Sequence, residues 1–169
     1  MNHVEVLVLH GSPGSGKTTL SRAVSELLGA AGKANAVIDL DELSLIYPSP
    51  GRSFACDNLK AIWPNYAAVP EIKVLISSVI ADEQARDRLR AAVSGARFTV
   101  CELTAPEPVL KNRVTAREPD EYWQKRLRGF VDLYHRRTDL TRIRDFQVET
   151  HGRPVDEAAR EILEKAGWS

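Results

Sequence analysis

The sequence predicts a three-layer α/β fold, in which helices cover both faces of one five-stranded parallel sheet. Five short apolar segments alternate along the chain with segments whose apolar residues recur at three- and four-residue spacing. A glycine-rich loop separates the first strand from the first helix. The 169 residues, 43% of them hydrophobic, are enough for one well-buried core. We therefore expect a single domain over residues 1–169.

The first half of the chain predicts two strands and two helices. A β-branched run at 4–9 stops at glycine, and a helical pattern follows over 17–28 with a C-cap glycine after it. The second strand is expected at 34–40, and prolines and a glycine then indicate an exposed loop. A helix is expected over 53–68, with its end left open by Pro64.

The second half continues the alternation. We expect strands at 72–76, 98–103 and 145–149, and a helix over 81–93 between the first two. After residue 103 the pattern predicts three more helices, one opened by Pro106 and Pro108 and running to 117, a long charged one over 120–139, and a last one opened by Pro154 and ending near Gly167. No repeat or linker interrupts this order.

Charge and composition narrow the function classes. The 23 Lys and Arg residues balance 23 Asp and Glu residues, so no net positive field favours nucleic acid or an anionic membrane. No apolar run reaches the roughly 20 residues of a membrane span, and the start lacks the basic region of a secretory signal. We expect a cytoplasmic protein that binds neither nucleic acid nor membrane. Cys56 and Cys101 are far apart and are expected to be reduced structural thiols.

The loop after the first strand meets the pattern G-x-x-x-x-G-K-[ST] in full. Its eight residues are Gly11, Ser12, Pro13, Gly14, Ser15, Gly16, Lys17 and Thr18. Glycines let successive backbone N–H groups turn toward phosphate oxygens, and the following helix presents its positive end. Lys17 is expected to reach the β- and γ-phosphates, Thr18 to ligate Mg²⁺, and Thr19 to complete the nucleotide-binding residues. The dinucleotide pattern fails, because Thr19 stands where its third glycine is needed.

This motif and the order of the elements resemble those of small P-loop kinases, similar in layout to gluconate, shikimate and adenylylsulfate kinases. The resemblance covers nearly the whole chain, although only the phosphate loop is highly specific. It implies a nucleoside-kinase-like P-loop NTPase fold with a helical lid at about 113–139. It also implies ATP and Mg²⁺ as cofactors and a small molecule as the phosphate acceptor.

Two carboxylates, Asp39 and Asp41, stand at the end of the second strand. A period of two places both side chains on one side, at the edge where open α/β sheets bind their ligands. A carboxylate there can orient an acceptor hydroxyl and take its proton. The resemblance implies that Asp41 faces the acceptor and acts in catalysis, while Asp39 supports Mg²⁺ or substrate. Alternatively, Asp41 only caps the following turn.

The third strand departs from the common pattern of P-loop enzymes. Many of them end this strand with an acidic residue that holds the magnesium shell, but here the strand ends in Ser77 and Ser78. Either Asp39 or Asp41 supplies that carboxylate, or catalysis is weak or absent. The two serines either bind a metal water or substrate, or simply end the strand.

The lid and the base site are predicted from arginines. Arg113 and Arg117 lie four apart on one helix face, and guanidinium groups stabilise the charge that develops during phosphoryl transfer. The resemblance implies that Arg117 approaches the phosphates in catalysis and that Arg113 sits against the adenine or the lid base, whereas a solvated face is the alternative. The resemblance also implies that Arg153 and Pro154 stack on the base, although Pro154 suits a helix start as well.

The leading interpretation is an ATP-dependent kinase acting on a small-molecule hydroxyl. A nucleoside or nucleotide kinase is the second reading. Such enzymes generally use a basic residue after the second strand to hold a phosphorylated acceptor or a base. Residues 42–48 of this sequence contain no Lys or Arg, and Arg52 is the nearest candidate. A non-catalytic nucleotide-binding module is the third, favoured by the missing acid of the third strand. His10, beside the loop, is expected to have a packing role. The sequence identifies neither the acceptor nor the oligomeric state.

Overall fold

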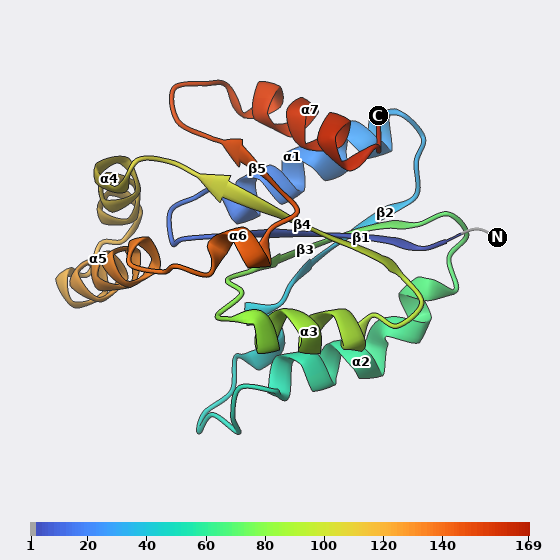
Figure 1. The fold of residues 1–169 in the computed structure, drawn as a ribbon, viewed down its shortest axis with the longest axis horizontal. Coiled ribbons are helices and arrows are strands. Elements are labelled where there is room, and N and C mark those ends of the chain that lie inside the picture. The colour runs from blue at the N-terminus through green and yellow to red at the C-terminus, as the bar shows by residue number, and fades with distance from the viewer. Residues whose placement is uncertain (1–2) are drawn as a thin grey trace.

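The computed structural model describes residues 3–169, and its centre is a five-stranded parallel sheet (Figure 1). The strands are β1 (Glu5–Gly11), β2 (Asn35–Asp39), β3 (Lys73–Ser78), β4 (Arg97–Thr104) and β5 (Phe146–Glu149). Their order across the sheet is β2-β3-β1-β4-β5, so the strand that leads into the glycine-rich loop lies in the middle. The predicted fold class is confirmed.

Helices cover both faces of this sheet. They are α1 (Lys17–Ala30), α2 (Phe54–Ala67), α3 (Glu83–Ala92), α4 (Glu107–Arg117), α5 (Glu121–His135), the short α6 (Leu140–Ile143) and α7 (Val155–Ala166), with a 3-10 turn η1 (Asp41–Ser44) after β2. Figure 1 shows α1 and α7 above the sheet and α2 and α3 below it, whereas α4 and α5 lie beyond the carboxyl ends of the strands.

Alternation along the strands builds two hydrophobic cores. Val6 and Val8 of β1 face the core that includes Leu59 of α2, while Leu7 and Leu9 face the core that includes Val24 of α1. Because both faces of a parallel sheet are covered, the central strands carry continuous apolar runs, such as residues 6–9 of β1 and 74–76 of β3. This is why short continuous apolar runs identified the strands.

The long helix expected over 120–139 is shorter in the structure. It ends at His135, and the chain then turns into α6. The turn brings Ile143 of α6 into the core beneath α3, where this side chain is fully buried. Pro64 lies inside α2 and does not end it, since the helix continues to Ala67.

Candidate functional site

The phosphate loop connects β1 to α1 at the carboxyl end of the sheet. Gly14 and Gly16 have φ angles of 81° and 95°, in the left-handed region that favours glycine. A Cβ atom on Gly14 would lie 2.9 Å from the carbonyl oxygen of Leu110 in α4. The loop can therefore pack closely against α4 only with glycine at this position.

Lys17 folds back over the loop. Its Nζ donates hydrogen bonds to the carbonyl oxygens of Gly11 (3.0 Å) and Ser12 (2.9 Å). Burial, together with the positive charge of Arg117, lowers the pKa of Lys17 to about 8, whereas Asp41 and Asp39 oppose the shift. The ammonium group thus lies in a partly desolvated place, where an anionic phosphate would stabilise its charge.

The hydrogen-bond donors of the phosphate loop suit the phosphate groups of a nucleoside triphosphate. The hydroxyl oxygen of Ser15 is buried and has no hydrogen-bond partner among residues 3–169, and a phosphate oxygen could supply one. Mg²⁺ is usually held by one or two protein oxygens together with phosphates and water. The Thr18 hydroxyl and the Asp39 carboxylate are oxygen ligands of that kind. In that position the ion would neutralise charge on the β- and γ-phosphate oxygens.

A cavity of about 330 Å³ opens beside the phosphate loop, and we call it the nucleotide-side cavity. It brings together residues of the loop, of α4 and of the segment after β5. It is lined by Gly14, Ser15, Gly16, Thr19, Leu20, Arg113, Arg117, Thr150, Arg153, Val155 and Ala158. Pro154 is not in this lining; it stands directly before α7, as the helix-start interpretation expects.

Arg113 bridges two walls of the nucleotide-side cavity. Its guanidinium donates to the carbonyl oxygen of Gly14 (3.1 Å) and to the Oγ1 (2.9 Å) and carbonyl oxygen (3.3 Å) of Thr150. The arginine therefore ties the phosphate loop to the segment between β5 and α7. Arg117, one turn further along α4, is exposed at the wall of the same cavity.

Arg153 is held along α7. Its guanidinium forms ion pairs with Glu157 (3.1 Å) and with Glu161, both on α7. That this guanidinium stacks on a base stays a prediction; in the structure Arg153 lines the nucleotide-side cavity and pairs with the two carboxylates.

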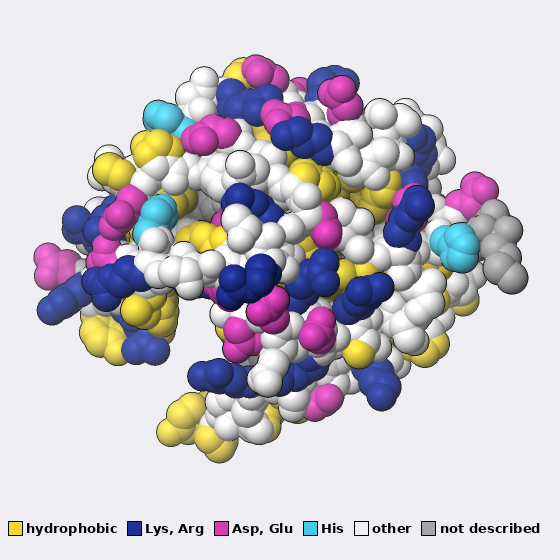
Figure 2. All heavy atoms as spheres, viewed as in Figure 1, with side chains coloured by type: hydrophobic (Ala, Val, Ile, Leu, Met, Phe, Trp, Pro, Cys, Tyr) yellow, Lys and Arg dark blue, Asp and Glu magenta, His cyan; other side chains and the backbone are white. Residues whose placement is uncertain are grey.

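A second cavity of about 420 Å³, the acceptor-side cavity, lies on the α2 and α3 face of the sheet. Figure 2 shows a deep notch between the side chains of α5 and the projecting loop before α2. The cavity is lined by Leu40, Asp41, Ser44, Arg52, Ala55, Cys56, Ser78, Val79, Ile80, Ala81, Asp82, Gln84, Ala85, Arg88 and Leu89. The predicted acceptor residue Asp41 is thus in a cavity wall.

The two aspartates are arranged differently from the expectation. β2 ends at Asp39, and Asp41 opens η1, so the period of two does not extend to it. Oδ1 of Asp39 accepts a hydrogen bond from the backbone N–H of Asp41 (3.0 Å), which makes Asp39 the residue that stabilises the turn. Burial and the nearby Asp39 charge raise the pKa of Asp41, while Lys17 opposes this rise. A raised pKa makes the Asp41 carboxylate a better proton acceptor.

The end of β3 carries no carboxylate. Ser77 and Ser78 are both buried, and the Ser78 side of the strand faces the acceptor-side cavity. The carbonyl oxygen of Ser77 accepts a hydrogen bond from the N–H of Leu40 (3.0 Å), which fixes the turn after β2.

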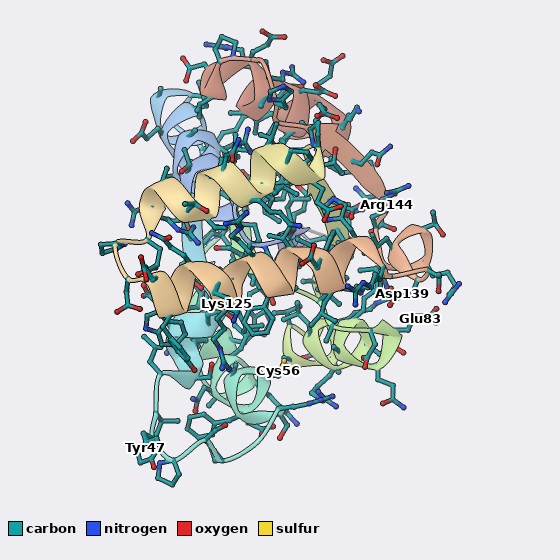
Figure 3. All side chains as sticks on the ribbon, turned by 90° about the vertical axis from the view of Figure 1, so that its left-hand side faces the viewer. Tyr47, Cys56, Glu83, Lys125, Asp139 and Arg144 are labelled. Atoms are coloured by element: carbon teal, nitrogen blue, oxygen red, sulfur yellow. The ribbon has the colours of Figure 1, made fainter. Side chains whose placement is uncertain are left out.

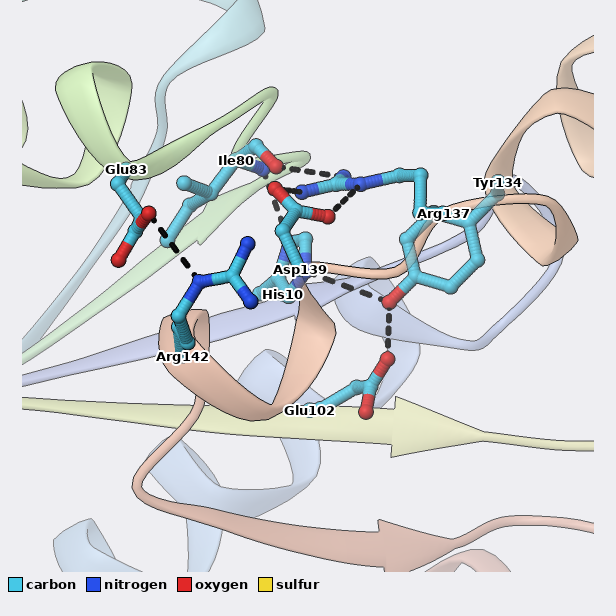
Figure 4. A network of polar contacts seen from close by, with 8 residues as sticks. All are labelled: His10, Ile80, Glu83, Glu102, Tyr134, Arg137, Asp139 and Arg142. Carbon is cyan, nitrogen blue, oxygen red and sulfur yellow. Dashed lines mark hydrogen bonds and ion pairs between the residues drawn. The ribbon is translucent and has the colours of Figure 1, made fainter.

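Sequence analysis missed a buried polar network behind the phosphate loop (Figure 4). His10 accepts a hydrogen bond at Nδ1 from the N–H of Ile80 (2.8 Å), and its Nε2 lies 3.3 Å from the hydroxyl of Tyr134. The Tyr134 hydroxyl donates to Glu102, whose other oxygen pairs with Arg144. A glutamate inside an apolar strand was the available signal, because buried carboxylates need partners.

The imidazole of His10 is neutral in this network. Burial, together with the positive charges of Arg137 and Lys17, lowers the pKa of His10 to about 3. With Nδ1 acting as acceptor, the proton is on Nε2 and points to Tyr134. The expected packing role of His10 thus includes two directed hydrogen bonds.

The helices α4 and α5 form a hairpin in front of the sheet, as Figure 3 shows. Lys111 of α4 pairs with Asp132 of α5 (2.6 Å), and Val131 is fully buried. The side chains at the start of α5 are more exposed: Tyr122 is 64% and Trp123 48% exposed.

Comparison with known proteins agrees with this architecture. No protein-family model matches the sequence, and no curated protein matches it. Many solved structures share the fold, among them P-loop kinases of small molecules, so the chain has the small P-loop kinase fold.

Three of these structures show the extent of the similarity. A gluconokinase from Sinorhizobium meliloti is 22% identical, with 99% of this chain and 94% of that chain covered and a TM-score of 0.66. The Mycobacterium tuberculosis APS kinase, solved with AMPPNP and APS, is 19% identical over 97% and 98%, with a TM-score of 0.69. A shikimate kinase from Acinetobacter baumannii, solved with shikimate, is 18% identical over 97% and 93%, with a TM-score of 0.62.

Within residues 3–169, no helix combines the length and the apolar character needed to span a bilayer.

Proposed function

We propose that the protein is an ATP- and Mg²⁺-dependent kinase that transfers the γ-phosphate to a hydroxyl group of a small molecule. The observation that carries this proposal is the position of Asp41. Its carboxylate lines the acceptor-side cavity, and its charge acts on Lys17 of the phosphate loop. One carboxylate thus stands between the two places that a kinase must connect.

The residues divide the reaction between them. The acceptor oxygen bonds to the γ-phosphorus while the bond from that phosphorus to the β,γ-bridging oxygen breaks. The hydroxyl proton passes to Asp41, and ADP leaves. Lys17 and Arg117 stabilise charge on the phosphate oxygens, and Arg113 holds the loop in place. Thr18 and Asp39 would hold Mg²⁺.

We also propose that the end of α4, α5 and the following turn, about residues 113–139, act as the lid. Arg117 at the end of α4 lines the nucleotide-side cavity, and the exposed start of α5 adjoins it in sequence. Both the lid and the two cavities belong to one domain in this proposal.

The test is acceptor-dependent release of ADP. Wild-type protein is incubated with ATP, Mg²⁺ and a metabolite library, and a product that gains one phosphate is sought by mass spectrometry. Lys17→Met and Asp41→Asn should both abolish the product, whereas Asp57→Asn on the exposed side of α2 should not. Transfer that persists in Asp41→Asn but is lost in Lys17→Met would falsify the assigned role of Asp41.

A nucleotide-binding module without phosphotransfer is the second candidate. The serines at the end of β3 favour it, because the carboxylate that commonly holds the magnesium shell is missing there. Nucleotide binding by calorimetry without any phosphorylated product would support this alternative.

A further inference from the structure

Two arginines line the acceptor-side cavity from different elements. Arg52 stands two residues before α2, and Arg88 lies in the middle of α3. Neither arginine forms an ion pair with a carboxylate in the part of the chain that the structure describes. Both guanidinium groups are therefore available to a ligand.

The placement of Arg88 follows from the helix. Gln84 and Arg88, and likewise Ala85 and Leu89, are four residues apart, so all four belong to one face of α3 and all four line the cavity. Arg90, on the same helix, is exposed but is not part of the lining. It therefore offers a matched control.

The charge of Arg88 reaches the cavity wall. Burial raises the pKa of the Cys56 thiol, and the positive charge of Arg88 opposes that rise. Cys56 itself lines the cavity, and Figure 3 shows it on α2. Arg88 from α3 and Cys56 from α2 thus line the same cavity.

The carboxylates of the cavity already have roles. Asp82 caps α3, since its Oδ1 accepts the N–H of Ala85 (2.8 Å), and the charge of Asp41 acts on Lys17. The cavity therefore has one carboxylate that interacts electrostatically with the phosphate-loop lysine, and two guanidinium groups without a carboxylate partner among residues 3–169. Arginine binds carboxylates and phosphates through two parallel hydrogen bonds, and apolar surroundings strengthen such contacts.

We infer that the acceptor carries an anionic group, a carboxylate or a phosphate, in addition to the hydroxyl that is phosphorylated, and that Arg52 and Arg88 bind this group. The hydroxyl would face Asp41 while the anionic group contacts the arginines. This inference rests on the proposed kinase function and specifies its substrate class.

The test uses compounds paired by charge. In each comparison an acidic compound is tested beside a neutral one. Gluconate is paired with glucitol, and shikimate is paired with its methyl ester. Glycerate and glycerol 3-phosphate are each paired with glycerol. Phosphate transfer from ATP is measured by mass spectrometry. Binding is measured separately, as the change in melting temperature of the protein saturated with AMPPNP and Mg²⁺, so that this readout does not require transfer. The variants are Arg52→Gln, Arg88→Gln and the control Arg90→Gln.

The expected result is binding and phosphorylation of an acidic member of a pair in preference to its neutral partner. Arg52→Gln and Arg88→Gln should each raise its Kd and KM about tenfold or more, because each removes a charge-assisted contact. Arg52→Gln and Arg88→Gln should change KM more than kcat, and Arg90→Gln should leave both constants unchanged. The carboxylate and phosphate members distinguish the two kinds of anion.

Other outcomes separate the two proposals. A neutral acceptor that is phosphorylated as well as its acidic partner, or an acidic acceptor indifferent to both arginine variants, would overturn the inference and leave the kinase function standing. Arginine-dependent binding of an acidic compound without any transfer would overturn the kinase function and retain the anion site. If no acidic compound binds, the inference is wrong.

Discussion

The hydroxyl of Tyr134 in α5 donates a hydrogen bond to the buried carboxylate of Glu102 in β4. Glu102 lies opposite His10 in the register of β4 and β1, and His10 directly precedes the phosphate loop. Because the same hydroxyl also lies 3.3 Å from Nε2 of His10, Tyr134 connects α5 both to β4 and to the strand that presents the loop.

Tyr134→Phe should destabilise the protein. The change removes the O–H group, leaving Glu102 with Arg144 alone and the Nε2–H of His10 without an acceptor. We expect a loss of about 1–3 kcal/mol in the free energy of unfolding, measured by urea denaturation. Tyr122→Phe, at an exposed position of the same helix, should change it by less than about 0.5 kcal/mol. Equal effects of the two variants would contradict the proposed anchoring.

His10 should make the fold sensitive to acid. Its pKa of about 3 in the folded state lies below the ordinary value of 6.5. Between pH 3 and pH 6.5, the unfolded state therefore binds a proton that the folded state does not. The contribution of His10 is fully present above pH 6.5 and falls by about 1.4 kcal/mol for each pH unit below it. His10→Asn, which retains an acceptor for the Ile80 N–H, should reduce this slope, whereas the exposed His151→Asn should not. Denaturation curves at several pH values provide the measurement.

Lys17 should couple nucleotide binding to proton uptake. Its pKa of about 8 in the free protein would rise when a phosphate pairs with the ammonium, so ADP binding at pH 8 should take up roughly half a proton. Affinity should fall as the pH rises above 8. Calorimetry in two buffers of different ionisation enthalpy measures the uptake, which Lys17→Met should eliminate. A wild-type uptake near zero would show that the free ammonium is already fully charged.

Arg113 and Thr150 should act as one unit in nucleotide binding. Arg113→Met removes three hydrogen bonds and frees the loop at Gly14, and Thr150→Val removes the hydroxyl that accepts one of them. Arg113→Met should weaken ADP binding about tenfold or more, and Thr150→Val less. The loss of ADP affinity in the double variant, expressed as a fold-change, should be smaller than the product of the fold-changes of the two single variants. Strictly multiplicative effects would argue that the two residues act separately.

Local patterns predicted most of the fold. The central strands β1 and β3 were found because they are buried on both faces, and the phosphate loop was found because its glycines and lysine stand at fixed spacing. The end of α5 was not found, because the turn into α6 depends on burial of Ile143 against α3, far away in the sequence. Local helical propensity does not contain that contact.

Local sequence patterns also predicted part of the candidate site. Lys17, Arg113 and Asp41 lie in or beside the two cavities, as their motifs indicated, although Asp41 is positioned by a turn and not by strand alternation. The network of Glu102 and Tyr134 joins residues separated by 32 positions, and only the folded chain brings them together.

One end of α5 is anchored by buried contacts, whereas the other end is exposed. Its far end is fixed by Tyr134, and Trp123 lies eleven residues away, about 16 Å along the helix axis. A tilt of about 10° around the fixed end would therefore move the start of the helix by roughly 3 Å. Small adjustments near the phosphate loop are thus enlarged at the opposite end of α5, where the exposed aromatic side chains stand.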